Sequence, residues 1–372
     1  MAKNKDEQNH EEFFRHLAWE MAWDLSYLDV LKDTFKHLKD TQINGSFDDA
    51  YIAEFNEDYP WQRALIVGDE KGDHGGDNRM GVQHIGNEKS KEWRRFSTWT
   101  RAGRRLVGQR LVEKIVESSK AVAALVTNDE IKDLEKGWDN IPRLNDRLRS
   151  KGMPHNYKGR FYDNRSIGFG TAFLVKENLL VTAGHNLWRN RKEIEVPDFS
   201  IVFDYHRDKK NNLPDLSSLK IFKPKAVKAH YYPDRHLDIG LITLDRPVKF
   251  TAPLECSPRS NQRDLRGEDL YTIGHPLGLH KIFSPNGKMY LPYKHGKSFI
   301  CNLDTYRGNS GSPILNQKTQ KIEGILLGGA PDFELKGTTY WNRRYRHWDL
   351  VRGISGERCQ DVLELKKLIK IP

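Results

Sequence analysis

Apolar residues near the amino terminus recur at three- and four-residue spacings. This spacing, which indicates one face of an amphipathic helix, is kept at Phe14, Leu17, Met21, Leu25, Leu28, Leu31, Phe35 and Leu38. Acidic residues gather in the first turns and lysines in the last, as the helix dipole favours. The pattern therefore predicts a long helix over residues 11–39, within a mostly α-helical N-terminal domain over residues 1–105.

Residues 88–118 show a second helical pattern, in which Trp93, Phe96 and Trp99 stand among several arginines. Aromatic and arginine side chains occur together in nucleic-acid-binding proteins, and an amphipathic helix with a basic solvated face has the same pattern. We predict a helix here and keep nucleic-acid binding as an alternative.

A Gly- and Asp-rich segment over residues 68–78 carries Asp69, Asp73, His74 and Asp77. These are metal-ligating residue types, but they lack the spacing of a calcium-binding loop. We therefore predict a solvated loop without a metal.

From about residue 119 the chain changes to short β-type runs separated by Gly, Pro and Asn. The runs lie at residues 121–126, 170–175, 179–183, 199–203, 239–244, 271–274, 298–303 and 321–329. Many short strands of this kind favour a barrel or sandwich over a parallel α/β sheet. A final Leu- and Lys-rich run predicts a helix over residues 357–369.

Composition and charge narrow the class of protein. The chain has 372 residues, with 37% hydrophobic and 10% aromatic, which excludes a disordered tail. No apolar stretch is long enough to cross a membrane, and the amino terminus is charged. Three scattered cysteines, Cys256, Cys301 and Cys359, suit a reducing compartment. We therefore expect a cytoplasmic protein without disulfides, and we expect no membrane partner.

The net charge of +10 is unevenly distributed. Residues 1–60 hold 14 acidic and 6 basic residues, so this segment carries −8 and the remainder carries +18. This asymmetry fits either an internal electrostatic contact or a basic surface for an acidic or nucleic-acid partner.

Three short motifs in the β-rich region supply the parts of a hydrolytic site. His185 follows a strand, Asp238 begins a buried strand, and Ser310 stands in a Gly-rich turn. A serine hydroxyl is a poor nucleophile at neutral pH, and it needs a base such as an imidazole whose tautomer is held by a carboxylate. Gly308 and Gly311 allow the turn to direct the N–H groups of Gly308 and Ser310 at a developing oxyanion.

The motifs VTAGH at 181–185, DIGLI at 238–242 and GNSGSPIL at 308–315 resemble the trypsin-like (chymotrypsin-fold) serine peptidases, in the bacterial glutamyl-endopeptidase-like branch. The resemblance covers a domain over residues 106–372, with a C-terminal helix. It implies an all-β fold of two six-stranded antiparallel β-barrels. It also implies His185 as general base, Asp238 as the residue that orients it, Ser310 as nucleophile, and the amides of Gly308 and Ser310 as oxyanion hole.

The chain also departs from this family. Asn186 replaces a cysteine that digestive trypsins carry, and Asn309 replaces the aspartate that pairs with their cut amino terminus. Asp304 matches the base of the trypsin specificity pocket, and Leu326 replaces the histidine of glutamyl-specific members. The resemblance therefore favours cleavage after Arg or Lys, with Thr305 as an alternative pocket residue and with Gly328 and Gly329 leaving the pocket open.

These observations predict an intracellular serine endopeptidase that acts on protein substrates. No metal or organic cofactor is expected. The N-terminal domain is expected to regulate activity through a regulatory protein or nucleic acid. The alternative is a catalytically silent protease fold that serves as a binding module, with nucleic acid bound by the basic body.

Overall fold

The computed structural model describes residues 79–94, 109–150, 161–189, 192–193, 198–232, 237–292, 297–301, 303, 305–328, 333–335, 348–350 and 357–370. They all belong to one compact unit, made of Asp77–Tyr232, Leu237–Gly337 and Tyr345–Pro372. The predicted helix 11–39 and the loop 68–78 lie outside the described residues.

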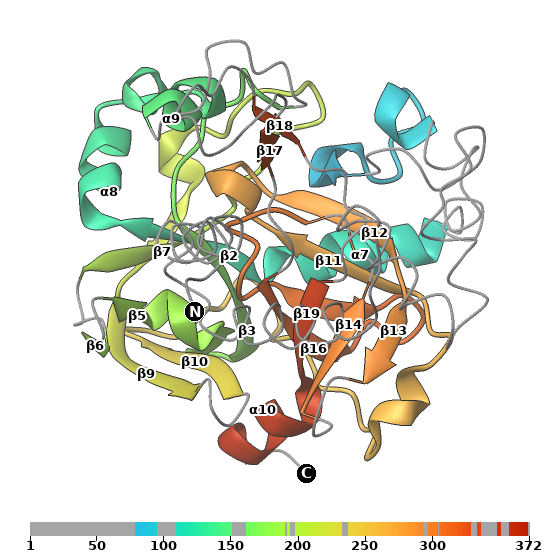
Figure 1. Ribbon diagram of the computed structural model, residues 1–372. Helices are drawn as coiled ribbons and strands as arrows, with labels where there is room; N and C mark the ends of the chain where they lie inside the picture. The colour runs from blue at the N-terminus through green and yellow to red at the C-terminus, as the bar shows by residue number, and fades with distance from the viewer. Residues whose placement is uncertain are drawn as a thin grey trace, which may run out of the picture. The chain divides into compact units, whose positions relative to one another are not determined.

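The first sheet has seven strands (Figure 1). In spatial order they are β8 (Lys220–Phe222), β7 (Phe199–Phe203), β2 (Val122–Thr127), β3 (Gly170–Lys176), β4 (Leu179–Thr182), β10 (Leu237–Leu244) and β9 (Pro224–Tyr232). The two edge strands, β8 and β9, are separated by a single residue, Lys223. The sheet must therefore curl until its edges approach, as in a barrel.

The second sheet has eight strands. Their order is β1 (Met80–Gly81), β12 (Ile282–Gly287), β11 (Leu270–Gly274), β15 (Pro313–Asn316), β16 (Ile322–Gly328), β19 (Glu357–Asp361), β14 (Ser298–Cys301) and β13 (Met289–Pro292). Two short ribbons, β5 (Trp188–Arg189) with β6 (Lys192–Glu193) and β17 (Phe333–Leu335) with β18 (Trp348–Leu350), complete the described strands.

The prediction of two antiparallel β-sheets is confirmed, since neighbouring strands in both sheets pair antiparallel. The described residues give seven and eight strands where the resemblance implies six in each. The additional strands include the very short β1 and β8 at sheet edges.

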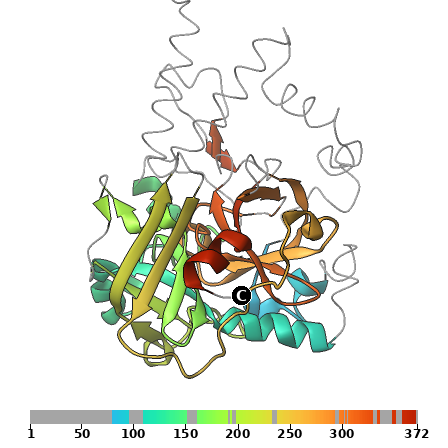
Figure 2. The ribbon, with the colours of Figure 1, turned by 90° about the horizontal axis from the view of Figure 1, so that it is seen from below.

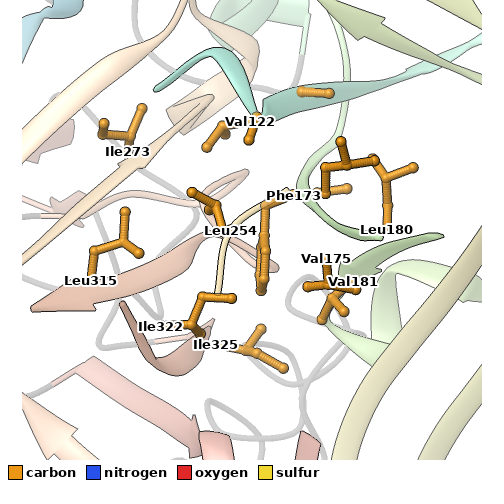
Figure 3. Close-up of a cluster of buried hydrophobic side chains, with 14 of the residues drawn as sticks. Val122, Phe173, Val175, Leu180, Val181, Leu254, Ile273, Leu315, Ile322 and Ile325 are labelled. Atoms are coloured by element: carbon orange, nitrogen blue, oxygen red, sulfur yellow. The ribbon is translucent and has the colours of Figure 1, made fainter. Parts of the chain in front are cut away.

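The two sheets share one hydrophobic core. Figure 3 shows part of this core, in which Phe173 and Val181 of the first sheet lie in the same cluster as Ile273 and Ile325 of the second. Figure 2 shows the first sheet, in green and yellow, beside the second sheet, in orange and red. Burial of these side chains is what holds the sheets together.

The described helices are α7 (Gln109–Lys120), α8 (Asn128–Glu135), α9 (Leu144–Ser150) and α10 (Val362–Ile369). Thr127 begins α8 with a capping box, in which its hydroxyl accepts from Glu130 N–H and the Glu130 carboxylate accepts from Thr127 N–H. None of the helices among the described residues is long and apolar enough to cross a membrane.

The prediction of a helix over residues 357–369 is wrong for its first part. Glu357–Asp361 forms β19, and α10 begins only at Val362 with Asp361 as its N-cap. Gln360 and Asp361 are fully buried, and their polar groups are satisfied by Lys297, Arg259 and other residues far away in the sequence. An apolar pattern cannot reveal a strand whose buried side chains are polar.

Residues before the predicted domain boundary at 106 contribute to this fold. Met80 pairs with Phe283 as part of β1, and both Met80 and Trp93 are buried in the shared core. Within the predicted helix 88–118, residues 91–94 and 109–120 are helical, and residues 95–108 lie outside the described residues.

Candidate active site

His185 lies in a tight turn after β4. The turn is the 3-10 helix η3 (Gly184–Leu187), and His185 is buried within it. A Cβ atom on Gly184 would meet Asp238 Oδ1 and Ile239 N at 3.0 Å. Glycine at this position therefore lets the main chain of the turn lie directly against β10.

The side chain of Asp238, in β10, holds both the imidazole and the main chain of His185. Asp238 Oδ2 is 2.8 Å from His185 Nδ1, and Asp238 Oδ1 accepts from His185 N–H at 2.8 Å. Because an ionised carboxylate can only accept, Nδ1 carries the proton in this hydrogen bond. The other ring nitrogen, Nε2, is then the basic one.

The environment of Asp238 keeps its carboxyl group ionised. Burial alone would raise the pKa of Asp238, but the charge and hydrogen bonds of His185 and the nearby Arg358 guanidinium hold it below its ordinary value. Arg358 Nη2 lies 4.0 Å from Asp238 Oδ2. The site thus contains a buried carboxylate that orients an imidazole.

Ser310 stands in a turn whose two flanking glycines have positive φ angles, 94° at Gly308 and 89° at Gly311. A Cβ atom on Gly308 would meet the carbonyl oxygen of His275 and the amide nitrogen of Leu277 at 2.8 Å. The turn therefore needs glycine both for its backbone conformation and for the space beside residues 275–277.

The main chain of Ser310 is bonded to the first sheet. Its carbonyl oxygen accepts from Thr171 N–H at 3.0 Å and from Asn186 Nδ2 at 2.8 Å. The hydroxyl of Thr171 also donates to Gly308 O at 2.8 Å. Since Asn186 is the neighbour of His185, these bonds bring the Ser310 turn to the same place as the imidazole and its carboxylate.

The Ser310 hydroxyl donates to the carbonyl oxygen of Leu327 in β16 at 2.8 Å. The amide N–H groups of Gly308 and Ser310 have no acceptor among the described residues. Two N–H donors in adjacent parts of the turn are thus available to a ligand oxygen.

The predicted specificity residues are placed less completely. Asp304 and Gly329 lie outside the described residues. Thr305 and Gly328 are half-buried, and the side chain of Leu326 is 1% exposed in a hydrophobic cluster of the second sheet. Of the predicted pocket residues, the described part of the chain thus includes Thr305, Leu326 and Gly328.

The motifs do not predict the supporting role of four residues of the site. Thr171 and Asn186 bind the Ser310 main chain, while Gln360 and Arg358 of β19 contact Asp238. Asn186 is next to His185 in the sequence, and this position is the one local sign of its role. Thr171, Arg358 and Gln360 are each more than 100 positions away from the site residue that they contact.

Comparison with known families identifies the central part of the described structure. Residues 170–325 match the profile of the family described as trypsin-like peptidase domain. This stretch contains all three residues of the predicted triad. The predicted resemblance to trypsin-like serine peptidases is therefore confirmed for this part of the chain.

Known relatives show a weaker likeness over a limited length. The chain is 25% identical over 155 residues to the glutamyl endopeptidases of Staphylococcus aureus strains MW2 and MSSA476. The match covers 36% of this chain and 45% and 44% of those two proteins, which is less than half of their length. Among solved structures, neuropsin, a serine protease expressed in the limbic system of mouse brain, matches with a TM-score of 0.41 and 13% identity, over 68% of this chain and 94% of that chain.

Proposed function

We propose that the trypsin-like peptidase domain of this chain is a serine endopeptidase that hydrolyses peptide bonds of protein substrates. In the proposed reaction, Ser310 Oγ attacks the scissile carbonyl carbon while His185 Nε2 takes the hydroxyl proton. His185 then gives that proton to the departing amine, and water hydrolyses the acyl-enzyme. Asp238 holds the imidazole in the required tautomer throughout.

The arrangement of His185 and Asp238 is the observation that carries this proposal. Two hydrogen bonds of 2.8 Å fix both the ring and the main chain of His185 to one buried carboxylate. A surface histidine or a helix-capping aspartate has no need of such a double attachment. The attachment of Ser310 to Asn186, the neighbour of His185, supports a nucleophile at the same site.

The hydroxyl of Ser310 is expected to rotate during the reaction. It donates to Leu327 O in this structure, and in the proposed reaction it turns to donate to His185 Nε2. The available N–H groups of Gly308 and Ser310 would then stabilise the oxyanion.

Labelling with a fluorophosphonate probe, together with hydrolysis of a peptide library, tests the proposal. We expect Ser310 to be labelled and Ser310→Ala to lose both labelling and hydrolysis. Ser312→Ala is the matched control, because it removes a buried hydroxyl from the same turn but not the nucleophile. Labelling that persists in Ser310→Ala, or a folded wild-type chain that neither reacts nor cleaves, would favour the silent binding module.

We further propose that residues 1–78 regulate this activity inside the cell, by responding to a regulatory protein or a nucleic acid. Because β1 begins at Met80 and belongs to the second sheet, a shortened chain must keep residues from 79 onward. Equal turnover and substrate range in the full and shortened chains would contradict regulation by this segment.

A further inference from the structure

β19 belongs to the second sheet, yet two of its residues contact Asp238 in the first sheet. Gln360 Oε1 accepts from Asp238 N–H at 2.9 Å, and Gln360 Nε2 donates to Lys297 O at 2.7 Å. Arg358, two residues earlier, places Nη2 at 4.0 Å from Asp238 Oδ2. One strand thus offers Asp238 a neutral partner and a charged partner.

We propose that Arg358 is a positioning residue whose guanidinium holds the Asp238 carboxylate and sets the pH range in which His185 acts as base. This inference rests on the proposed peptidase function. It assigns to the C-terminal strand, which lies beyond the matched residues 170–325, a direct influence on the base.

The distances allow an effect of Arg358 on the imidazole. Asp238 Oδ2 is 2.8 Å from His185 Nδ1 and 4.0 Å from Arg358 Nη2, so the two nitrogens are at most about 7 Å apart. A fixed positive charge at this distance disfavours a second positive charge on the ring. With an effective dielectric constant of about 20, the charge of Arg358 is expected to move the pH at which the imidazole loses its proton by roughly one to two pH units.

Among the described residues, two uncharged side chains also lie beside the pair. The phenol of Tyr231 on β9 faces the imidazole edge-on, with ring centroids 6.4 Å apart, and a phenol carries no positive charge in either protonation state. Gln360 is uncharged. Among the described residues, the positive charge that lowers the pKa of Asp238, apart from His185 itself, is that of Arg358.

The decisive experiment measures kcat/KM against pH for the full chain and for variants at residue 358. In Arg358→Gln and Arg358→Met we expect the acid limb of the profile to move upward by about one pH unit, because the imidazole then keeps its proton to higher pH. Arg358→Lys keeps the positive charge, so its acid limb should stay at the wild-type pH. Gln360→Met is the matched control: it removes the neutral partner from the same strand, and it should lower kcat without moving the limb.

A second measurement does not depend on turnover. In Ser310→Ala, the imidazole of His185 can be titrated by NMR, with and without Arg358→Gln, and the same upward shift is expected. A wild-type enzyme that cleaves peptides but shows an unchanged limb in both neutral variants would refute the role of Arg358 and leave the peptidase function intact. Failure of both neutral variants to fold would also refute it, because the role would then be structural. An inactive, unlabelled wild-type chain would instead refute the peptidase function.

Discussion

Gly311, directly after the proposed nucleophile, has no room for a side chain. A Cβ atom there would lie 2.2 Å from Thr171 O and 2.2 Å from Thr182 Oγ1. These two oxygens are themselves joined by a hydrogen bond of 2.6 Å, so neither can move without breaking it. The substitution Gly311→Ala therefore tests whether the close packing of this turn is required for the site.

The expected loss of stability has two parts. The φ angle of 89° costs alanine about 1–2 kcal/mol relative to glycine. Relief of the clash breaks the buried Thr182–Thr171 bond and weakens the Thr171–Ser310 bond, at roughly 1–3 kcal/mol for a buried group left unsatisfied. Together we expect Gly311→Ala to lower the free energy of unfolding by about 4 kcal/mol.

Gly267→Ala provides the matched control. Gly267 has a similar φ of 80°, but nothing lies within 4 Å of a Cβ atom placed there. We expect this variant to lose only about 1 kcal/mol and to keep full fluorophosphonate reactivity. Urea unfolding and labelling rates measure both variants. Close packing at Gly311 is not required if Gly311→Ala unfolds within about 1 kcal/mol of Gly267→Ala and is labelled at the wild-type rate.

Three further predictions concern charge and specificity. Asp238→Asn should lower kcat about ten-thousandfold while the chain stays folded, because the imidazole would adopt the wrong tautomer; steady-state kinetics and a melting curve measure this. Burial and the nearby Lys281 lower the pKa of His275 to about 3, so the unfolded chain takes up a proton below about pH 6.5 that the folded chain does not. The free energy of unfolding should therefore decrease as the pH is lowered below about 6.5, and His275 should account for about 3 kcal/mol of this decrease at pH 4.5. In His275→Gln, urea titrations at several pH values should show a smaller decrease. Asp304→Ser should abolish the predicted preference for Arg or Lys in a peptide library, and a wild-type preference for Glu would contradict the pocket assignment.

Local patterns predicted much of the described fold. The strand predicted at residues 199–203 is β7 without change, and the apolar runs at 121–126 and 170–175 are β2 and β3 to within one residue. These strands are almost fully buried, and most of their side chains are apolar. Where burial and hydrophobicity coincide, the sequence is sufficient.

In the strands that the sequence did not predict, burial and hydrophobicity do not occur together. β9 lies at a sheet edge, where Lys225 and Lys228 face solvent, and its pattern is too polar for a simple apolar criterion. β19 is buried but polar, because its side chains bind distant partners. Contacts of this kind depend on the tertiary fold, and no local pattern contains them.

The same distinction applies to the candidate site. The short motifs predicted His185, Asp238 and Ser310, since each motif keeps its residue in a characteristic local setting. The bonds that bring these residues together, from Asn186 to Ser310 and from Gln360 to Asp238, join different sheets. Only the folded arrangement reveals them.

The bonds on the Ser310 carbonyl have a mechanical consequence. They hold Ser310, the proposed nucleophile, by its own main chain, and one of them starts from the residue next to His185. The hydrogen bond between Asn186 and the Ser310 carbonyl lies only about one residue, or roughly 3.5 Å of chain, from His185. A small rotation of one sheet against the other is therefore expected to move His185 and Ser310 very little relative to each other. The alignment of His185 and Ser310 therefore depends strongly on this short local link.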